Sequence, residues 1–260
     1  MKFGFGHGIL FACREQKRQN AGTHEQEAGI LYYSSKGGGT YVDIGFMAKY
    51  APLYIEAAGL TLRLGIFGIV FSLIIGLFCS VAQYYKIPIL RRGASIYIEV
   101  SRNTPLLVQL FFLYFGLPKA GIRLSAELCA VIGLSFLGGS YMAEAFRSGL
   151  EAVEKGQIES GLSIGLNRRQ LMQYVIFPQV LSISVPGICA NIIFLIKETS
   201  LFSAVALADL MYVAKDLIGL YYKTDESLLM LVAAYLVLLL PISVLASVLE
   251  RRLRHGRFGN

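Results

Sequence analysis

Two long stretches without a charged residue constrain the fold of this chain more than any other feature. Residues 64–85 and residues 228–249 contain no Asp, Glu, Lys or Arg. Each is longer than the roughly 20 residues that an α-helix needs to cross a hydrocarbon core about 30 Å thick. Across the 260 residues, 55% are hydrophobic and only 16% are charged, whereas soluble domains carry about 25% charged residues. The composition therefore predicts a chain embedded in a membrane and excludes disorder of most of it.

Three further apolar segments complete the predicted set of spans. Residues 170–196 are long enough to cross, although Pro178 and Pro186 interrupt them; we expect Pro178 near a helix start and Pro186 at a kink within the bilayer. Residues 103–118 and 128–143 are shorter, and each could alone be a buried helix, but we interpret both as spans that include flanking charged residues. The expected fold class is all-α, a polytopic membrane protein with five transmembrane helices at about residues 60–84, 98–118, 126–148, 175–197 and 227–250.

Basic residues predict how these spans are oriented. Most of them follow the first, third and fifth spans: Lys86, Arg91, Arg92, Arg147, Lys155, Arg168, Arg169, Arg251, Arg252, Arg254 and Arg257. The opposite loops hold only Lys119, Arg123, Lys215 and Lys223. Because cytoplasmic loops are enriched in Lys and Arg, the C-terminus is predicted in the cytoplasm and the N-terminus outside. The net charge of +7 is then an inside-facing bias and no sign of nucleic-acid binding.

The two ends of the chain differ in composition from its apolar middle. Residues 1–40 are polar and Gly-rich, and their Arg14, Lys17 and Arg18 oppose the predicted orientation. We expect a disordered tail, or translated upstream sequence with the working start nearer Met47, in preference to acylation at Cys13. Residues 41–59 are interpreted as an amphipathic external lead-in, residues 60–250 as the membrane domain, and residues 251–260 as a basic cytoplasmic tail.

Residue patterns typical of catalysis are missing from the sequence. It has no GxxxxGK[ST] phosphate loop, no HExxH and no CxxC. His7, His24 and His255 fall in the predicted tails, and Cys79, Cys129 and Cys189 fall in apolar spans, where a thiol behaves as a small hydrophobe. We therefore expect no enzyme activity, no metal and no cofactor in this chain.

The loop between the third and fourth spans, about residues 149–174, is longer than a hairpin between spans requires. Its apolar residues Leu150, Val153, Ile158, Leu162 and Leu171 could form one face of a helix. Such a helix could dock into a groove on a soluble partner or lie flat on the inner leaflet, and the physical argument alone leaves both interpretations open.

In this loop Glu159-Ser160-Gly161 is followed after three residues by Gly165, and Val175 to Pro178 come nine residues later. This spacing resembles the EAA loop of permease subunits in ATP-binding-cassette (ABC) importers, with Glu159-Ser160-Gly161 at the EAA position and Val175 to Pro178 at the end of the motif. Ser160 and Gly161 replace the family's two alanines.

Two more segments narrow the resemblance. Residues 99–118, with Asn103 where Gly is common, are similar to the second-helix signature of the histidine/glutamine/arginine, or polar amino acid, permeases. Residues 197–201 resemble that family's Lys-acidic-Thr-Ser-Leu run, with Glu198 in place of Asp. The matches extend over about residues 50–250.

This resemblance implies a type I ABC importer permease that carries a polar amino acid into the cell through the cell membrane. The implied partners are cytoplasmic ATPase subunits that bind ATP and Mg, a second permease chain (identical or sister) and an extracytoplasmic solute-binding protein. The residues implied in coupling to the ATPase are Gly156, Gln157, Glu159, Ser160, Gly161, Gly165 and Pro178.

Recognition of a zwitterionic amino acid requires a partner for its ammonium and a donor for its carboxylate, away from lipid. The candidates for this pathway are Gln109, Tyr114, Asn191, Lys197 and Glu198. Hydrogen bonding between helices is an equal alternative for Gln109 and Asn191.

Other polar and small residues of the spans are given structural roles. Glu99, Arg102, Glu144 and Arg147 are expected in ion pairs or as loop anchors near the span ends, and residues 138–140, Gly-Gly-Ser, in close helix packing. The alternative functions are an ion-gradient-driven secondary transporter and a non-transporting membrane scaffold.

Overall fold

The computed structural model describes residues 42–255, and the predictions made for residues 1–40 lie outside these described residues. Every regular element in this part is helical, as the sequence predicts. In chain order they are α2 (Ile44–Tyr84), α3 (Pro88–Arg102), α4 (Leu106–Phe111), η1 (Phe112–Gly116), η2 (Leu117–Ala120), α5 (Ala126–Glu151), α6 (Lys155–Ser163), α7 (Arg168–Leu171), η3 (Met172–Ile176), α8 (Phe177–Glu198), η4 (Thr199–Val205), α9 (Leu210–Tyr221) and α10 (Thr224–His255).

Four helical segments of the described chain are long and apolar enough to cross a membrane: Ile44–Tyr84, Ala126–Glu151, Arg168–Val205 and Thr224–Arg252. The first begins well before the predicted residue 60, because the Asp43 side chain caps it by accepting a hydrogen bond from Phe46 N–H at 3.0 Å. The predicted lead-in, residues 41–59, is thus not a separate element, because from Ile44 onward it forms the first turns of α2 itself.

The prediction of a single helix over residues 98–118 is wrong. Helix α3 ends at Arg102, and a new helical segment, the shorter apolar Leu106–Ala120, begins after Pro105. Proline lacks the N–H that would continue the ladder, and it disfavours helical geometry at the preceding Thr104. The described residues therefore contain four uninterrupted long spans and one broken segment in place of five unbroken helices.

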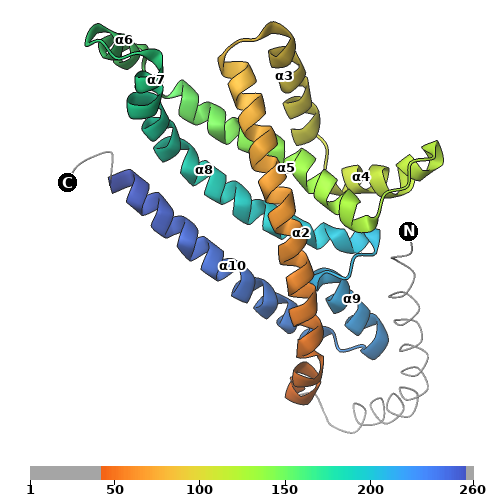
Figure 1. The fold of residues 1–260 in the computed structure, drawn as a ribbon. Coiled ribbons are helices and arrows are strands. Elements are labelled where there is room, and N and C mark those ends of the chain that lie inside the picture. The colour runs from red at the N-terminus through yellow and green to blue at the C-terminus, as the bar shows by residue number, and fades with distance from the viewer. Residues whose placement is uncertain (1–41, 256–260) are drawn as a thin grey trace, which may run out of the picture.

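Small residues let α5 approach its neighbours closely, as predicted for residues 138–140. Gly138 packs against Ser72 of α2, and a Cβ atom at Gly139 would lie 2.5 Å from the Tyr97 hydroxyl of α3. On another face, a Cβ atom at Gly149 would lie 2.8 Å from the Val180 carbonyl of α8. Figure 1 shows α2 crossing α5, with α8 and α10 beside it. Helix α5 is accordingly the most buried of the four long spans.

The molecule has two distinct ends in Figure 1. Helices α6 and α7 lie at the upper end with the turn between α2 and α3, and α9 lies at the lower end with the first turns of α2 and α10. At that lower end Lys223 Nζ lies 3.3 Å from Asp43 Oδ2 and 3.5 Å from Glu226 Oε1. The pKa of Asp43 is lowered, chiefly because its carboxylate accepts the Phe46 N–H hydrogen bond. These contacts tie the starts of α2 and α10 together.

Asp209, the N-cap of α9, is buried with 1% of its surface exposed. One carboxylate oxygen accepts a hydrogen bond from Tyr212 N–H at 3.0 Å, and the other, Oδ2, has no hydrogen-bond partner among the described residues. Burial raises the pKa of Asp209 to about 6, against 3.8 ordinarily. The folded chain therefore holds this proton more tightly than the unfolded chain does.

We expect the Asp209→Asn variant to be more stable than the wild type at pH 7.5. The contribution of protonated Asp209 to the free energy of unfolding is fully present below the unfolded-state pKa of 3.8. It is lost as pH rises through the folded-state pKa of about 6. The loss is at most on the order of 3 kcal/mol. Asparagine keeps the capping oxygen but does not titrate. The unfolding midpoint temperatures of both proteins are measured in detergent between pH 4.5 and 7.5. A difference between variant and wild type that stays constant across this pH range would contradict the prediction.

Candidate functional site: a coupling loop and two charged cavities

The loop predicted to contact an ATPase has a small apolar core of its own. Val153, Leu171, Ile176 and Val180 are buried together, and Ile158 of α6 packs against them with other partly buried residues. This cluster attaches α6 to α7, η3 and the first turns of α8. Of the apolar face expected from the sequence, Leu150, Val153, Ile158 and Leu171 are thus directed at the protein itself, whereas Leu162 is exposed.

A glycine ends α6. Gly165 has a φ of +87°, a left-handed conformation that favours glycine. Its N–H donates to the Leu162 carbonyl at 3.0 Å, and Leu166 N–H donates to the Gly161 carbonyl at 3.1 Å. These two bonds form a Schellman motif, which satisfies the last carbonyls of the helix and turns the chain toward α7.

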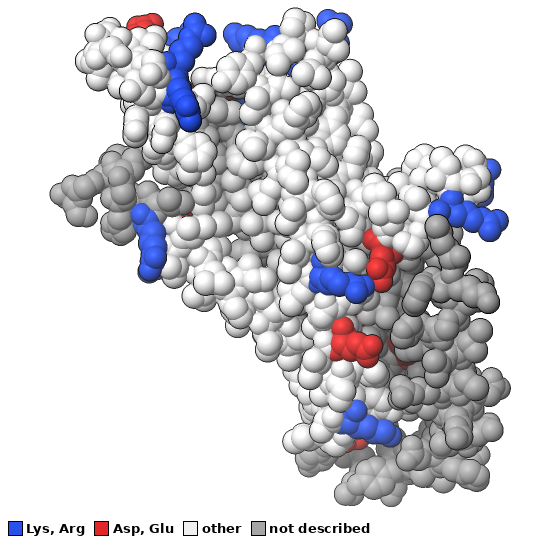
Figure 2. Space-filling view, viewed as in Figure 1, with Lys and Arg blue, Asp and Glu red and all other residues white. Residues whose placement is uncertain are grey.

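The polar residues of α6 are presented on the surface. Gly156, Gln157, Glu159 and Ser160 are all exposed. Gln157 Oε1 accepts a hydrogen bond from Gln179 Nε2 at 2.7 Å. Of the remaining predicted coupling residues, Gly161 lies on the buried side of α6, against Leu171, and Pro178 lies in the first turn of α8. Figure 2 shows Lys and Arg side chains gathered at this same end of the molecule.

A first cavity of about 210 Å³ lies where the corner between α3 and α4 meets α5 and α8. Its charged lining residues are Arg102 and Glu198, and Tyr141 and Phe194 add aromatic walls. The Arg102 guanidinium lies 5.3 Å from the centre of the Tyr141 ring. The cavity is smaller than the roughly 300–1,000 Å³ pockets that hold drug-sized ligands. It suits a small solute that carries both charges.

A second cavity of about 530 Å³ adjoins the first, since Arg102, Asn103 and Tyr141 line both. It extends toward the turn between α2 and α3, where Gln83, Arg91 and Ser95 line it. The second cavity thus extends from the corner between α3 and α4 toward the turn between α2 and α3.

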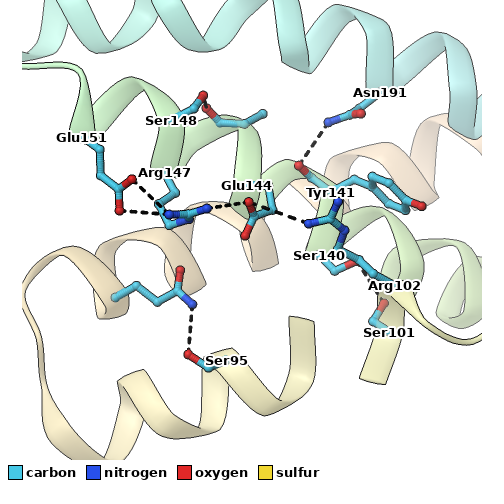
Figure 3. Close-up of polar contacts among 12 residues, drawn as sticks. Ser95, Ser101, Arg102, Ser140, Tyr141, Glu144, Arg147, Ser148, Glu151 and Asn191 are labelled. Atoms are coloured by element: carbon cyan, nitrogen blue, oxygen red, sulfur yellow. Dashed lines mark hydrogen bonds and ion pairs between the residues drawn. The ribbon is translucent and has the colours of Figure 1, made fainter. Parts of the chain in front are cut away.

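Four side chains of alternating charge, which we call the charge row, line the second cavity: Arg102, Glu144, Arg147 and Glu151 (Figure 3). Arg147 donates to Glu144 at 2.7 Å and to both carboxylate oxygens of Glu151 at 3.0 Å. Arg102 lies 3.7 Å from Glu144 and so connects α3 to α5. These side chains are 30–60% exposed, so their pairing contributes little to stability.

Of the five predicted pathway residues, the structure brings only Glu198 to the first cavity. Asn191 donates to the Tyr141 carbonyl at 3.1 Å and joins α8 to α5. Tyr114 stacks its ring edge against Phe115, and Lys197 is exposed at the end of α8. Gln109 donates to atoms of the corner between α3 and α4. Of the expected ion-pair residues, Arg102, Glu144 and Arg147 are paired.

Sequence reasoning missed Arg102 and Tyr141 as cavity residues. Arg102 was treated as an anchor near a span end because an unbroken helix over residues 98–118 would have placed it at the membrane surface. The break at Pro105 instead places it at the corner between α3 and α4, where it lines both cavities. Pro105 was the available signal, since a proline inside an apolar run often ends a helix.

Comparison with known proteins identifies close similarity over most of the chain. Residues 68–255 match the family model described as "Binding-protein-dependent transport system inner membrane component". The glutamine transport system permease protein GlnP of Escherichia coli is 34% identical over 78% of this chain and 94% of its own. The probable amino-acid ABC transporter permease protein PatM of Vibrio harveyi is 33% identical over 74% of this chain and 88% of its own.

Solved structures share the fold as well. The crystal structure of an amino acid ABC transporter with histidines superposes with a TM-score of 0.76 at 35% identity, covering 82% of this chain and all of that one. An inward-facing methionine ABC transporter superposes with a TM-score of 0.66 at 19% identity, covering 79% of this chain and 98% of that one. This second likeness concerns the fold alone.

Proposed function

Because this chain belongs to the inner membrane components of binding-protein-dependent transport systems, we propose that it moves a polar amino acid through the cavity lined by Arg102 and Glu198. Family membership confirms the predicted ABC importer permease over the ion-driven transporter and the scaffold. The chain is a multi-pass inner-membrane transport subunit without its own catalytic domain or cofactor. An ATPase and a solute-binding protein are its partners.

The observation that supports an amino acid as the substrate is the presence of opposite charges in one small cavity. Arg102 supplies a planar set of N–H donors that suits a carboxylate, and Glu198 supplies a carboxylate for an ammonium group. The two groups meet the needs of an amino acid zwitterion, whatever its side chain. Glutamine and histidine are the first cargoes to test, since they are named for a relative and for a similar structure.

Uptake into proteoliposomes tests this proposal. The permease is reconstituted with its ATPase and binding protein, and ATP-dependent accumulation of tritiated amino acids is measured. We expect Arg102→Ala and Glu198→Gln each to lower uptake roughly tenfold, because each removes one charge-assisted contact. Arg63→Ala is the matched control, since Arg63 also joins two helices through an ion pair, 2.9 Å from Glu127, away from both cavities. Wild-type uptake by both cavity variants would overturn the proposed pathway.

The coupling role belongs to α6 in this proposal. Its exposed face, with Gly156, Gln157, Glu159 and Ser160, is the surface offered to the ATPase. Gly161, Gly165 and Pro178 shape the helix and its attachment. Two findings support this role: the apolar core leaves that face free, and α6 lies at the end where basic residues gather (Figure 2).

The proposed topology places α6 and the turn between α2 and α3 in the cytoplasm, and α9 with the first turns of α2 outside. In this arrangement α3 and the segment Leu106–Ala120 together make a fifth, broken crossing. Two observations support this topology: basic residues gather at the end that carries α6, and neither α3 nor Leu106–Ala120 is long enough to cross alone. A second permease chain, identical or sister, completes the proposed transporter, and the largely exposed apolar surface of α10 is available for it.

A further inference from the structure

The corner between α3 and α4 carries an unusual hydrogen-bonding problem. In a continuous helix the Ser101 carbonyl would accept from the N–H of residue 105, but that residue is proline and has no N–H. Ser101 is fully buried, and a buried carbonyl without a donor is strongly disfavoured. A side chain must therefore take the place of the missing backbone donor.

Gln109, one turn into α4, supplies that donor together with the Thr104 hydroxyl, whose Oγ1 also lies 3.3 Å from the Ser101 carbonyl. Its Nε2 lies 3.3 Å from the Ser101 carbonyl, 3.1 Å from the Thr104 carbonyl and 2.9 Å from Thr104 Oγ1. The Thr104 hydroxyl in turn donates to the Val100 carbonyl at 2.8 Å. One amide group thus connects both sides of the break, and the bonds run in a consistent direction from donor to acceptor.

The segment held in this way forms one wall of the first cavity. Arg102, Asn103, Thr104 and Pro105 all line it, whereas Gln109 is not among the residues lining either cavity in the described chain. Arg102 extends from this corner to within 3.7 Å of Glu144 and 5.3 Å of the Tyr141 ring centre. The direction of the guanidinium therefore depends on the geometry of the corner.

We propose that Gln109 is a positioning residue that holds the corner between α3 and α4 so that Arg102 faces the substrate cavity. The inference rests on the proposed function, in which that cavity receives the amino acid. It replaces the role predicted for Gln109 from the sequence, direct contact with the substrate, because the Nε2 donor is already engaged with the corner.

A double-mutant cycle on the complete permease–ATPase complex tests the proposal. The probe is the tritiated protein amino acid that the wild-type transporter accumulates fastest in proteoliposomes, and its equilibrium binding is measured in detergent without the binding protein. Gln109→Met keeps the length of the side chain but has no donor. We expect it to weaken binding roughly tenfold, as Arg102→Ala does. In the Arg102→Ala background it should cost no more than about twofold.

A second variant keeps the test open if Gln109→Met does not assemble. Thr104→Val removes the hydroxyl that links Gln109 to Val100 and preserves the shape of the residue. The same loss of affinity, again absent in the Arg102→Ala background, supports the positioning role.

Each contrary outcome has a distinct meaning. If the effects of Gln109→Met and Arg102→Ala multiply in the double variant, Gln109 acts independently as a substrate contact and the positioning role is wrong. If only Arg102→Ala weakens binding, the positioning role is wrong and the proposed cavity stands. If no amino acid accumulates or binds, or if Arg102→Ala binds the probe normally, the proposed function fails and this inference falls with it.

Discussion

Replacing Glu159 by Lys is expected to lower ATP-dependent uptake by at least roughly tenfold without unfolding the permease. Glu159 is exposed on α6, and within the described residues its side chain has no hydrogen bond or ion pair. The substitution therefore removes no intramolecular contact found in this structure. Its effect should come from placing a positive charge where a negative one is proposed to meet the ATPase, which costs affinity through like-charge contact and desolvation.

Two measurements on one preparation separate coupling from folding. The first is the amount of ATPase that copurifies with the tagged permease, and the second is ATP-dependent uptake after reconstitution. Asp225→Lys is the matched control: it makes the same change of charge at an exposed carboxylate, but in the first turn of α10, at the opposite end of the molecule (Figure 1). We expect the control to retain both properties. Normal ATPase retention and normal uptake by Glu159→Lys would remove Glu159 from the coupling surface.

The sequence predicted the turn after α6 better than it predicted the first cavity, and the physical reason is the sequence separation of the residues in contact. The turn after α6 depends on residues 161–166, so a glycine at the right spacing is enough to indicate it. The first cavity needs Arg102 of α3, Tyr141 of α5 and Glu198 of α8 to meet. No local pattern encodes that meeting, which follows from the packing of three helices.

Helix positions show the same division. The runs around residues 64–85 and 228–249 are uninterrupted and became α2 and α10. The prediction of one helix over residues 98–118 is wrong because it rests on hydrophobicity alone. Pro105 and the hydrogen bonds between Thr104 and Gln109 determine where the helix breaks. Asn191 could serve substrate or helix packing on sequence grounds, and the contact with Tyr141 needed the structure.

Replacing Gly76 by Leu is expected to have the largest effect on stability. Gly76 of α2 faces the α5 backbone: a Cβ atom there would lie 2.5 Å from Met142 Cβ, 2.8 Å from Ala143 N and 2.9 Å from the Met142 carbonyl carbon. Two of these three atoms belong to the backbone of a helix and cannot rotate away. The helices must separate instead, and overpacking of this kind costs about 1–3 kcal/mol or more.

Gly59→Leu is the control for this effect, because it makes the same substitution in the same helix. A Cβ atom at Gly59 would meet nothing within 4 Å in the described chain, and leucine is the better helix former by a few tenths to about 1 kcal/mol. Thermal midpoints from size-exclusion chromatography in detergent should therefore fall for Gly76→Leu, fall less for Gly76→Ala and stay level or rise for Gly59→Leu. Equal midpoints for Gly76→Leu and Gly59→Leu would mean that α2 and α5 do not pack as closely as Gly76 implies. The graded series thus measures how far the packing of α2 on α5 depends on the absence of a side chain at residue 76.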